Sequence, residues 1–246
     1  MICSITRKSF NRIVYVYKVV THTLNVLQNT LSDNGISYSV TASHIGPLCE
    51  GLIFIGLSDK PTIYRQSEQM PVGEESFSLC QNGPAPLIYA GGELGLAYGI
   101  LELAERIADE GESALLHWPN MTCAPGNKVR GADRFITNSQ DEQWWMNREY
   151  WDSYFKMMLS SRFNSFTLLF GFDTAYFSPP YPFFVDVPGF ESVKVAEWFH
   201  FDRKEYLAAL NQIGEMCHDY GMCFTIVLLQ HSMGFAVVVL DTVNDL

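Results

Sequence analysis

The chain has little basic charge, no long apolar run and no closely spaced cysteine pair, and each absence excludes a class of protein. Its 16 Lys and Arg residues stand against 27 Asp and Glu residues, a formal net charge of -11 at pH 7. Binding to phosphate backbones and anionic lipid surfaces depends on Lys and Arg, so nucleic-acid and membrane partners are not expected. Neutral or cationic small molecules remain possible ligands.

The apolar segments are short. No stretch reaches the roughly 18 consecutive apolar residues of a membrane span, and basic side chains interrupt residues 1–20, which therefore make a poor signal peptide. We expect a cytoplasmic location by default. The six cysteines contain no C-x-x-C pair, so no metal site is predicted and most are expected to be buried thiols. No cofactor is predicted.

The composition is that of a folded chain able to bury a sizeable core, with 48% hydrophobic and 14% aromatic residues among 246. Residues 117–128 contain Pro119, Pro125 and Gly126, which is typical of a connection between domains. We therefore predict two domains, residues 1–128 and residues 129–246.

The first domain alternates helical and strand periods, which predicts a small α+β fold. One helical stripe, ended by turn residues 33–35, is formed by Val20, Leu24, Leu27 and Leu31. Strands are predicted at residues 36–40, 52–57, 76–79 and 86–90.

A glycine-rich turn, residues 91–95, follows the last of these strands and opens a helix that ends near Gly111. The spacing of Gly91, Gly92 and Gly95 does not match G-x-G-x-x-G, so nucleotide binding is not expected. Gly95 and Gly99 are instead predicted to let the helix lie close to the sheet.

The second domain has near-continuous apolar strands at residues 129–136, 165–171 and 223–230, the last two each preceded by a helical segment. Asn147 is predicted to cap the first helix, and Asp202 with Glu205 resembles a capping box for the second. This order is typical of a parallel sheet in an α/β protein. A complete (β/α)8 TIM barrel takes about 250 residues, and only 118 follow Lys128. We predict an incomplete barrel of about three βα units.

Candidate ligand residues lie in or after these strands, because the carboxyl-terminal strand ends form the working face of a parallel barrel. Arg130, Asp133 and Arg134 place three charges in an otherwise apolar strand. They form either an internal ion pair or a site in which an arginine binds a sugar hydroxyl or a carboxylate.

Further candidates follow the second and third strands: Asp173, Tyr176, Gln230 and His231. Tyr176 belongs to a long aromatic-rich stretch, residues 172–202, which is either a saccharide platform or an insertion with its own small core. His231 suits substrate hydroxyls or a structural hydrogen bond.

Glycosidases normally use two carboxyl groups across the scissile bond, and no convincing pair is found. Asp173 is the best-placed single acid. Asp141 and Glu142, which follow the first strand, are expected to be solvated loop carboxylates.

Residues 90–107 (AGGELGLAYGILELAERI), residues 129–135 (VRGADRF) and Arg162-Phe-Asn164 together resemble α-glucuronidase-like and β-hexosaminidase-like glycoside hydrolases. The likeness covers most of residues 12–231. It implies a non-catalytic α+β domain, similar to the second domain of β-hexosaminidases, followed by the early part of a TIM-barrel catalytic domain. It also implies that Arg130 holds the sugar in the -1 subsite.

The resemblance implies hydrolysis of O-glycosidic bonds in polysaccharide fragments, uronate-bearing ends included, with an oligosaccharide as partner. The family's Asp-Glu pair on the fourth barrel strand has no match here, and residues 234–246 do not continue a barrel pattern. The alternative is a non-catalytic carbohydrate-binding or scaffold remnant of a truncated glycosidase. Residues 234–246 are the obvious cover for an open sheet edge.

Overall fold

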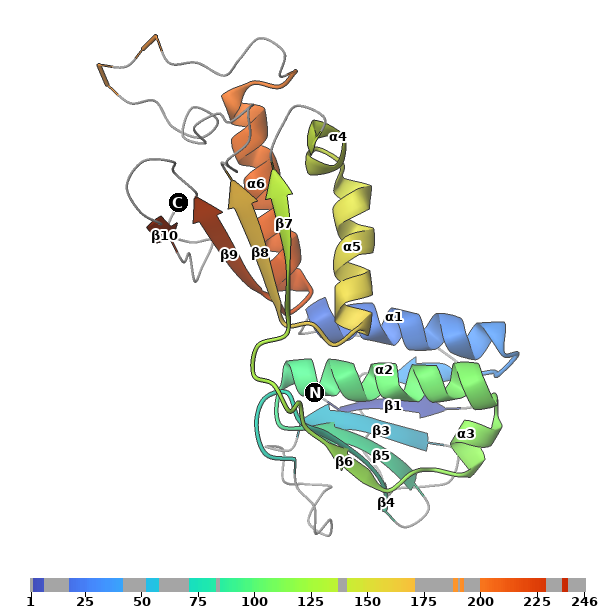
Figure 1. Ribbon diagram of the computed structural model, residues 1–246. Helices are drawn as coiled ribbons and strands as arrows, with labels where there is room; N and C mark the ends of the chain where they lie inside the picture. Colours follow the sequence, from blue (N-terminus) through green and yellow to red (C-terminus); the bar gives the residue numbers. More distant parts are fainter. Residues whose placement is uncertain are drawn as a thin grey trace. The chain divides into compact units, whose positions relative to one another are not determined.

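The structure is a computed structural model of the chain. It describes residues 2–6, 18–41, 52–57, 71–82, 85–136, 141–170, 188–189, 191–192, 200–228 and 236–238. The chain divides into two compact units, Met1–Lys128 and Val129–Leu246, and each has its own sheet (Figure 1).

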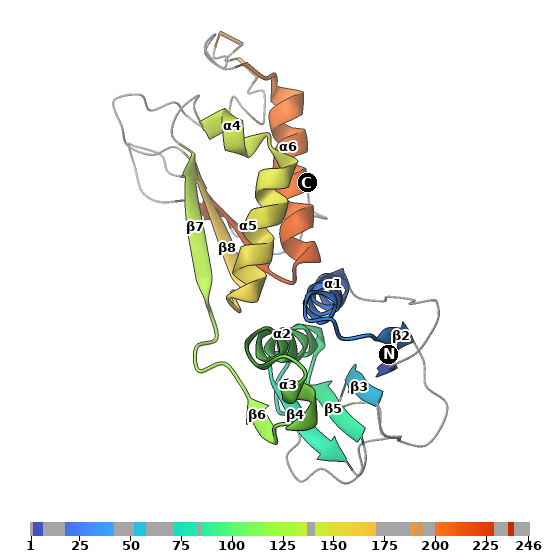
Figure 2. The ribbon, with the colours of Figure 1, turned by 90° about the vertical axis from the view of Figure 1, so that its right-hand side faces the viewer.

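The first unit is an α+β arrangement around a six-stranded mixed sheet in the order β2-β1-β3-β5-β4-β6. Its elements are β1 Ile2–Thr6, α1 Lys18–Asp33, β2 Ser39–Thr41, β3 Leu52–Leu57, β4 Phe77–Asn82, β5 Ala85–Ala90, α2 Glu93–Glu110, α3 Ser113–Leu116 and β6 Met121–Cys123. Among these described strands, β3 and β5 pair in parallel and the other pairs are antiparallel. Helices α1 and α2 lie side by side on the same side of the sheet (Figure 2).

The predicted stripe of α1 is confirmed, because Val20, Leu24, Leu27 and Leu31 are all buried. The strand predicted at residues 36–40 begins later, at Ser39. The reason lies in the end of α1, where Gly35 has a φ of 67° and donates to the Ser32 carbonyl while Ile36 donates to the Leu31 carbonyl. This Schellman-type cap uses the residues that would otherwise start the strand.

The glycines at the start of α2 permit close packing. A Cβ on Gly95 would lie 2.4 Å from the Ser76 carbonyl oxygen, and one on Gly99 would lie 2.8 Å from Cγ2 of Ile88 in β5. The prediction that these two glycines let the helix approach the sheet is therefore confirmed.

The predicted linker contains a strand that the sequence analysis did not predict. β6 forms an edge of the sheet by pairing with β4, and the Ser78 and Thr122 hydroxyls lie 2.7 Å apart in a hydrogen bond. Pro and Gly in residues 117–128 predict a loop, and the short strand there depends on pairing with β4, which is distant in the sequence.

The second unit is a four-stranded sheet in the order β10-β9-β8-β7. Its elements are β7 Gly131–Ile136, α4 Glu142–Trp145, α5 Arg148–Ser160, β8 Ser165–Phe170, α6 Arg203–Asp219, β9 Cys223–Leu228 and β10 Ala236–Val238. β7, β8 and β9 pair in parallel, so the predicted α/β class of this region is confirmed. β10 pairs antiparallel with β9 and covers that edge, as expected for this segment.

Helices α5 and α6 lie on the same side of this sheet (Figures 1 and 2). The Asn147 side chain caps α5 by accepting from the Tyr150 N–H, and Asp202 with Glu205 forms the predicted capping box of α6. Trp151 and Phe155 of α5 are buried and contact the Phe166 ring of β8.

The opposite sheet face carries the alternate strand positions. The in-register rows are Gly131, Ser165 and Cys223; Asp133, Thr167 and Thr225; and Phe135, Leu169 and Val227. Asp133 is exposed and Phe135 is 38% exposed. A side chain on this face is therefore available to a ligand.

Candidate functional site

The candidate site lies at α4, the first described element after the carboxyl end of β7, and its central group is Glu142. Glu142 is the first residue of α4 and only 5% of it is exposed. The expectation of a solvated loop carboxylate is wrong for this residue. An ionised carboxylate is costly to bury unless donors surround it, and three hydrogen-bond donors do so.

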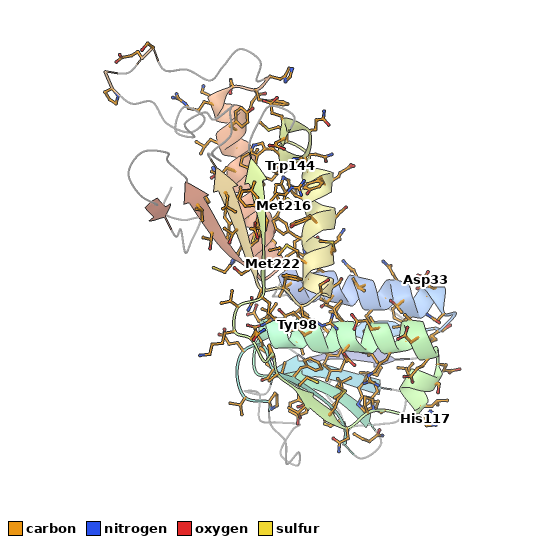
Figure 3. All side chains as sticks on the ribbon, viewed as in Figure 1. Asp33, Tyr98, His117, Trp144, Met216 and Met222 are labelled. Atoms are coloured by element: carbon orange, nitrogen blue, oxygen red, sulfur yellow. The ribbon has the colours of Figure 1, made fainter. Side chains whose placement is uncertain are left out.

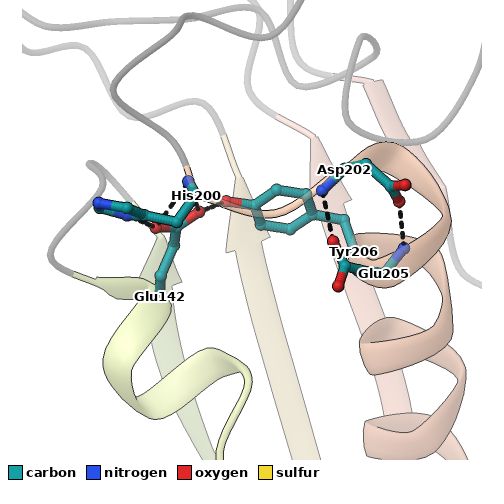
Figure 4. A network of polar contacts seen from close by, with 5 residues as sticks. All are labelled: Glu142, His200, Asp202, Glu205 and Tyr206. Atoms are coloured by element: carbon teal, nitrogen blue, oxygen red, sulfur yellow. Dashed lines mark hydrogen bonds and ion pairs between the residues drawn. The ribbon is translucent and has the colours of Figure 1, made fainter.

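Those donors belong to His200, which precedes α6, and to Tyr206 near the start of α6 (Figure 4). The His200 backbone N–H donates to Oε1 of Glu142 at 3.0 Å, and Nδ1 of His200 lies 2.7 Å from Oε2. The Tyr206 hydroxyl also donates to Oε1. One buried carboxylate therefore joins residues 58 and 64 positions further along the chain.

His200 differs from Glu142 in exposure, since 77% of its side chain is accessible to solvent. Its ring extends away from Glu142 beyond the Nδ1 contact (Figure 4). The capping box at Asp202 and Glu205 fixes the chain two residues further on. Glu142 thus holds the Nδ1 side of the imidazole ring, and the rest of the ring is exposed to solvent.

Tyr206 acts as a hydrogen-bond donor in this cluster. Burial raises the pKa of its hydroxyl well above the usual range, and the hydrogen bond to the Glu142 carboxylate raises that pKa further. The phenol therefore keeps its proton at neutral pH and continues to donate to the carboxylate.

A pocket of about 650 Å³ adjoins the cluster. It is lined by Glu142, Gln143, Met146, Asn147, Arg148, Glu149, His200 and Phe201. The volume lies in the range of about 300 to 1,000 Å³ that is usual for small-molecule sites. The lining combines charged and amide groups with Met146 and one aromatic ring.

The described part of the chain holds neither a metal cluster nor a membrane-spanning helix. Within it, no three His, Cys, Asp or Glu residues come together as a metal site. No described helix is long and apolar enough to cross a membrane.

Arg130 lies at the amino-terminal end of the sheet, one residue before β7. Its backbone N–H donates to Oδ1 of Asn164 at 2.9 Å, and its Nε donates to the Arg162 carbonyl at 2.7 Å. This end is opposite to the carboxyl strand ends, and the bonds hold the turn that leads into β8. A sugar-binding role for Arg130 stays a prediction, and its side chain already has a structural contact.

Asp133 and Arg134 lie on opposite faces of β7. Asp133 is exposed on the face opposite the helices. The Arg134 guanidinium carbon lies 4.3 Å from the ring centroid of Trp144 and 5.1 Å from that of Tyr150 (Trp144 is labelled in Figure 3). Cation–π contacts of this kind stabilise a partly buried arginine. The structure therefore does not bring Arg130, Asp133 and Arg134 into one site.

The remaining predicted ligands, Asp173, Tyr176, Gln230 and His231, lie outside the described residues. Sequence reasoning missed Glu142, His200 and Tyr206 as a group. No local signal identified the group, because the partners of Glu142 lie 58 and 64 positions further along the chain.

Comparison with known proteins gives a structural likeness without a sequence match. No family model matches the chain, and no curated protein matches it. The solved structure of a GH138 enzyme targeting pectin rhamnogalacturonan II matches 86% of this chain with a TM-score of 0.62 and 16% identity. The chain spans only 30% of that enzyme. At this identity the likeness shows a shared fold.

Two further matches have TM-scores below 0.5 and add no argument. BtGH115A, described as a GH115 4-O-methyl-α-glucuronidase with specificity for decorated arabinogalactans, has a TM-score of 0.47 and 16% identity, covering 85% of this chain and 27% of its own. CpGH84B has a TM-score of 0.46 and 13% identity, covering 90% of this chain and 35% of its own.

Proposed function

We propose that residues 129–246 are the first part of a glycoside-hydrolase-type barrel and that the chain binds carbohydrate on the sheet face opposite the helices, from Asp133 toward the carboxyl ends of β7, β8 and β9. The observation that carries this proposal is the fold shared with the GH138 enzyme. Three parallel strands with helices on one side and an exposed Asp133 and Phe135 on the other support it, since this is how a barrel wall presents its inner face.

The proposed reaction class is hydrolysis of O-glycosidic bonds in polysaccharide fragments, uronate-bearing ends included. In such reactions one carboxyl group protonates the leaving oxygen while a second acts as nucleophile or base, about 5 to 9.5 Å away. Glu142 is occupied by three donors, so we do not assign it either role. Residues 1–128 are proposed as a non-catalytic domain.

A second candidate is a carbohydrate-binding or scaffold unit without hydrolytic activity. The observation that favours it is β10, which lies antiparallel beside β9, where a continuing barrel has a parallel strand. Both candidates require sugar binding, and only the first requires bond cleavage.

The test is titration of the full chain with rhamnogalacturonan fragments and neutral oligosaccharides, followed by calorimetry and by reducing-end release. Asp133→Ala, on the exposed sheet face, should weaken binding at least about tenfold without loss of fold. Asp109→Ala, an exposed carboxylate on α2, is the matched control and should bind as wild type. Absence of binding to every sugar, or equal binding by both variants, contradicts the proposal.

Arg130→Ala separates the two roles open to that residue. Lost binding with an unchanged urea midpoint would assign it to the sugar. A lowered midpoint would assign it to the contact with the Arg162 carbonyl, and this is the outcome we expect.

A further inference from the structure

We propose that His200 binds a hydroxyl group of a neutral sugar through Nε2 in the pocket beside α4, with Glu142 and Tyr206 as its positioning residues. The inference rests on the proposed carbohydrate function and adds to it a subsite and a ligand class.

The contact with Glu142 decides which imidazole nitrogen of His200 carries the proton. Nδ1 of His200 lies 2.7 Å from Oε2 of Glu142. An ionised carboxylate only accepts hydrogen bonds, so Nδ1 carries the proton. In the neutral ring Nε2 is then an acceptor, which suits the O–H of a sugar. This is the arrangement by which a carboxylate sets the tautomer of a functional histidine.

Glu142 and Tyr206 hold the His200 side chain in one orientation. Glu142 accepts from both the backbone N–H and the ring of His200, so two bonds to one carboxylate hold the residue. Tyr206, buried on α6, donates to the same carboxylate and holds it in turn. A side chain that is 77% exposed would ordinarily sample several rotamers. Restraining it lowers the entropy that a ligand must otherwise remove on binding.

The residues that line the pocket favour a neutral sugar as the ligand. Gln143 offers an amide donor and acceptor, and Asn147 offers an amide donor, since its Oδ1 accepts from the Tyr150 N–H. Phe201 offers a ring on which the apolar face of a sugar stacks. The charged groups of the lining are Glu142, Glu149, Arg148 and, when protonated, His200. Two carboxylates against one permanent cation favour a neutral ring over a uronate at neutral pH.

The experiment must separate ligand binding from a purely structural anchor. In His200→Asn the amide nitrogen takes the place of Nδ1, and the contact to Glu142 is kept while Nε2 is lost. His218→Asn, on an exposed histidine in the last turn of α6, is the matched control. The full chain is titrated with methyl glycosides, a neutral oligosaccharide and galacturonate, and urea midpoints are measured for each variant.

We expect His200→Asn to weaken binding of the neutral sugars at least about tenfold at an unchanged urea midpoint, and His218→Asn to bind as wild type. Addition of neutral sugar to wild type should shift the ¹⁵N resonance of His200 Nε2, which an anchor alone would leave in place. Tyr206→Phe should reduce binding less than His200→Asn does.

Two results would overturn this inference but not the proposed function. One is binding of neutral sugars by His200→Asn equal to that of wild type, and the other is a His200 Nε2 resonance that does not shift at saturating sugar. Tighter binding of galacturonate than of neutral sugars would overturn the ligand class. A wild-type chain that binds none of the probes would overturn the proposed function as well, so the two failures are distinguishable.

Discussion

At the residue scale, the burial of a polar side chain is decided by the donors that reach it. Glu142 and Asp141 are neighbours after the same strand, yet Glu142 is buried under donors from His200 and Tyr206, while Asp141 lies half-buried with the Trp144 indole donating to it at 3.2 Å. The local sequence predicts the same degree of burial for both acids. The distant partners distinguish them.

The glycines before α2 give a prediction at this scale. A Cβ on Gly91 would lie 2.1 Å from the Gly73 carbonyl oxygen, whereas one on Gly126 would meet nothing within 4 Å. Gly91→Ala should lower the free energy of unfolding by about 1 to 3 kcal/mol, because a backbone atom must move. Gly126→Ala should change it by less than about 0.5 kcal/mol. Urea denaturation checks both, and equal midpoints for the two variants would contradict the packing argument.

At the element scale, the helices of the second unit begin where side chains satisfy their first N–H groups. Asp202 accepts from the Glu205 N–H at 2.9 Å, and the Glu205 side chain accepts from the Asp202 N–H at 2.7 Å. The box also fixes the chain next to His200. The helix cap and the candidate site therefore lie two residues apart in the chain.

Removing the cap tests this element. Asp202→Ala should destabilise the second unit by about 1 kcal/mol, since the Glu205 N–H loses its acceptor. Lys204→Ala, exposed in the same first turn, is the control and should change stability by less than about 0.5 kcal/mol. Circular dichroism during urea unfolding measures both. A control that loses as much as Asp202→Ala would show that the first turn, and not the cap, is responsible.

At the scale of the whole molecule, the chain holds two compact units with separate sheets. Among the described residues, the groups with the largest rise in pKa are a thiol and two tyrosine hydroxyls of the second unit. Burial raises the pKa of the Cys217 thiol well above its usual range, and burial together with the bond to Asp152 does the same for the pKa of the Tyr220 hydroxyl. Both groups keep their protons in the folded state at a pH where the unfolded chain releases them.

Stability from these groups is fully present below their unfolded pKa values, about 8.5 for Cys and about 10 for Tyr, and is lost as pH rises toward the folded values. We expect the urea midpoint of the second unit to fall between about pH 8 and pH 11. Cys217→Ala should flatten the first part of this decline, and Cys123→Ala, at a thiol of the first unit, should leave the curve of the second unit unchanged. A midpoint independent of pH would contradict the expectation.

The features predicted correctly from sequence are those that depend on neighbours within a few positions. The stripe of α1, the Asn147 cap and the Asp202–Glu205 box all follow from side chains that meet within one or two turns, so their physics is readable in the printed order of residues. The alternation of apolar and polar residues in the strands is of the same kind.

The features that only the tertiary structure decided depend on distant partners. β6 requires β4, β10 requires β9, and the burial of Glu142 requires a histidine 58 residues and a tyrosine 64 residues further on. The free energy of a buried carboxylate is set by which donors surround it, and periodicity carries no information about donors so far along the chain. The candidate site therefore depends on the tertiary structure: β7, α5 and α6 were predicted from the sequence, whereas α4, which carries Glu142, was not.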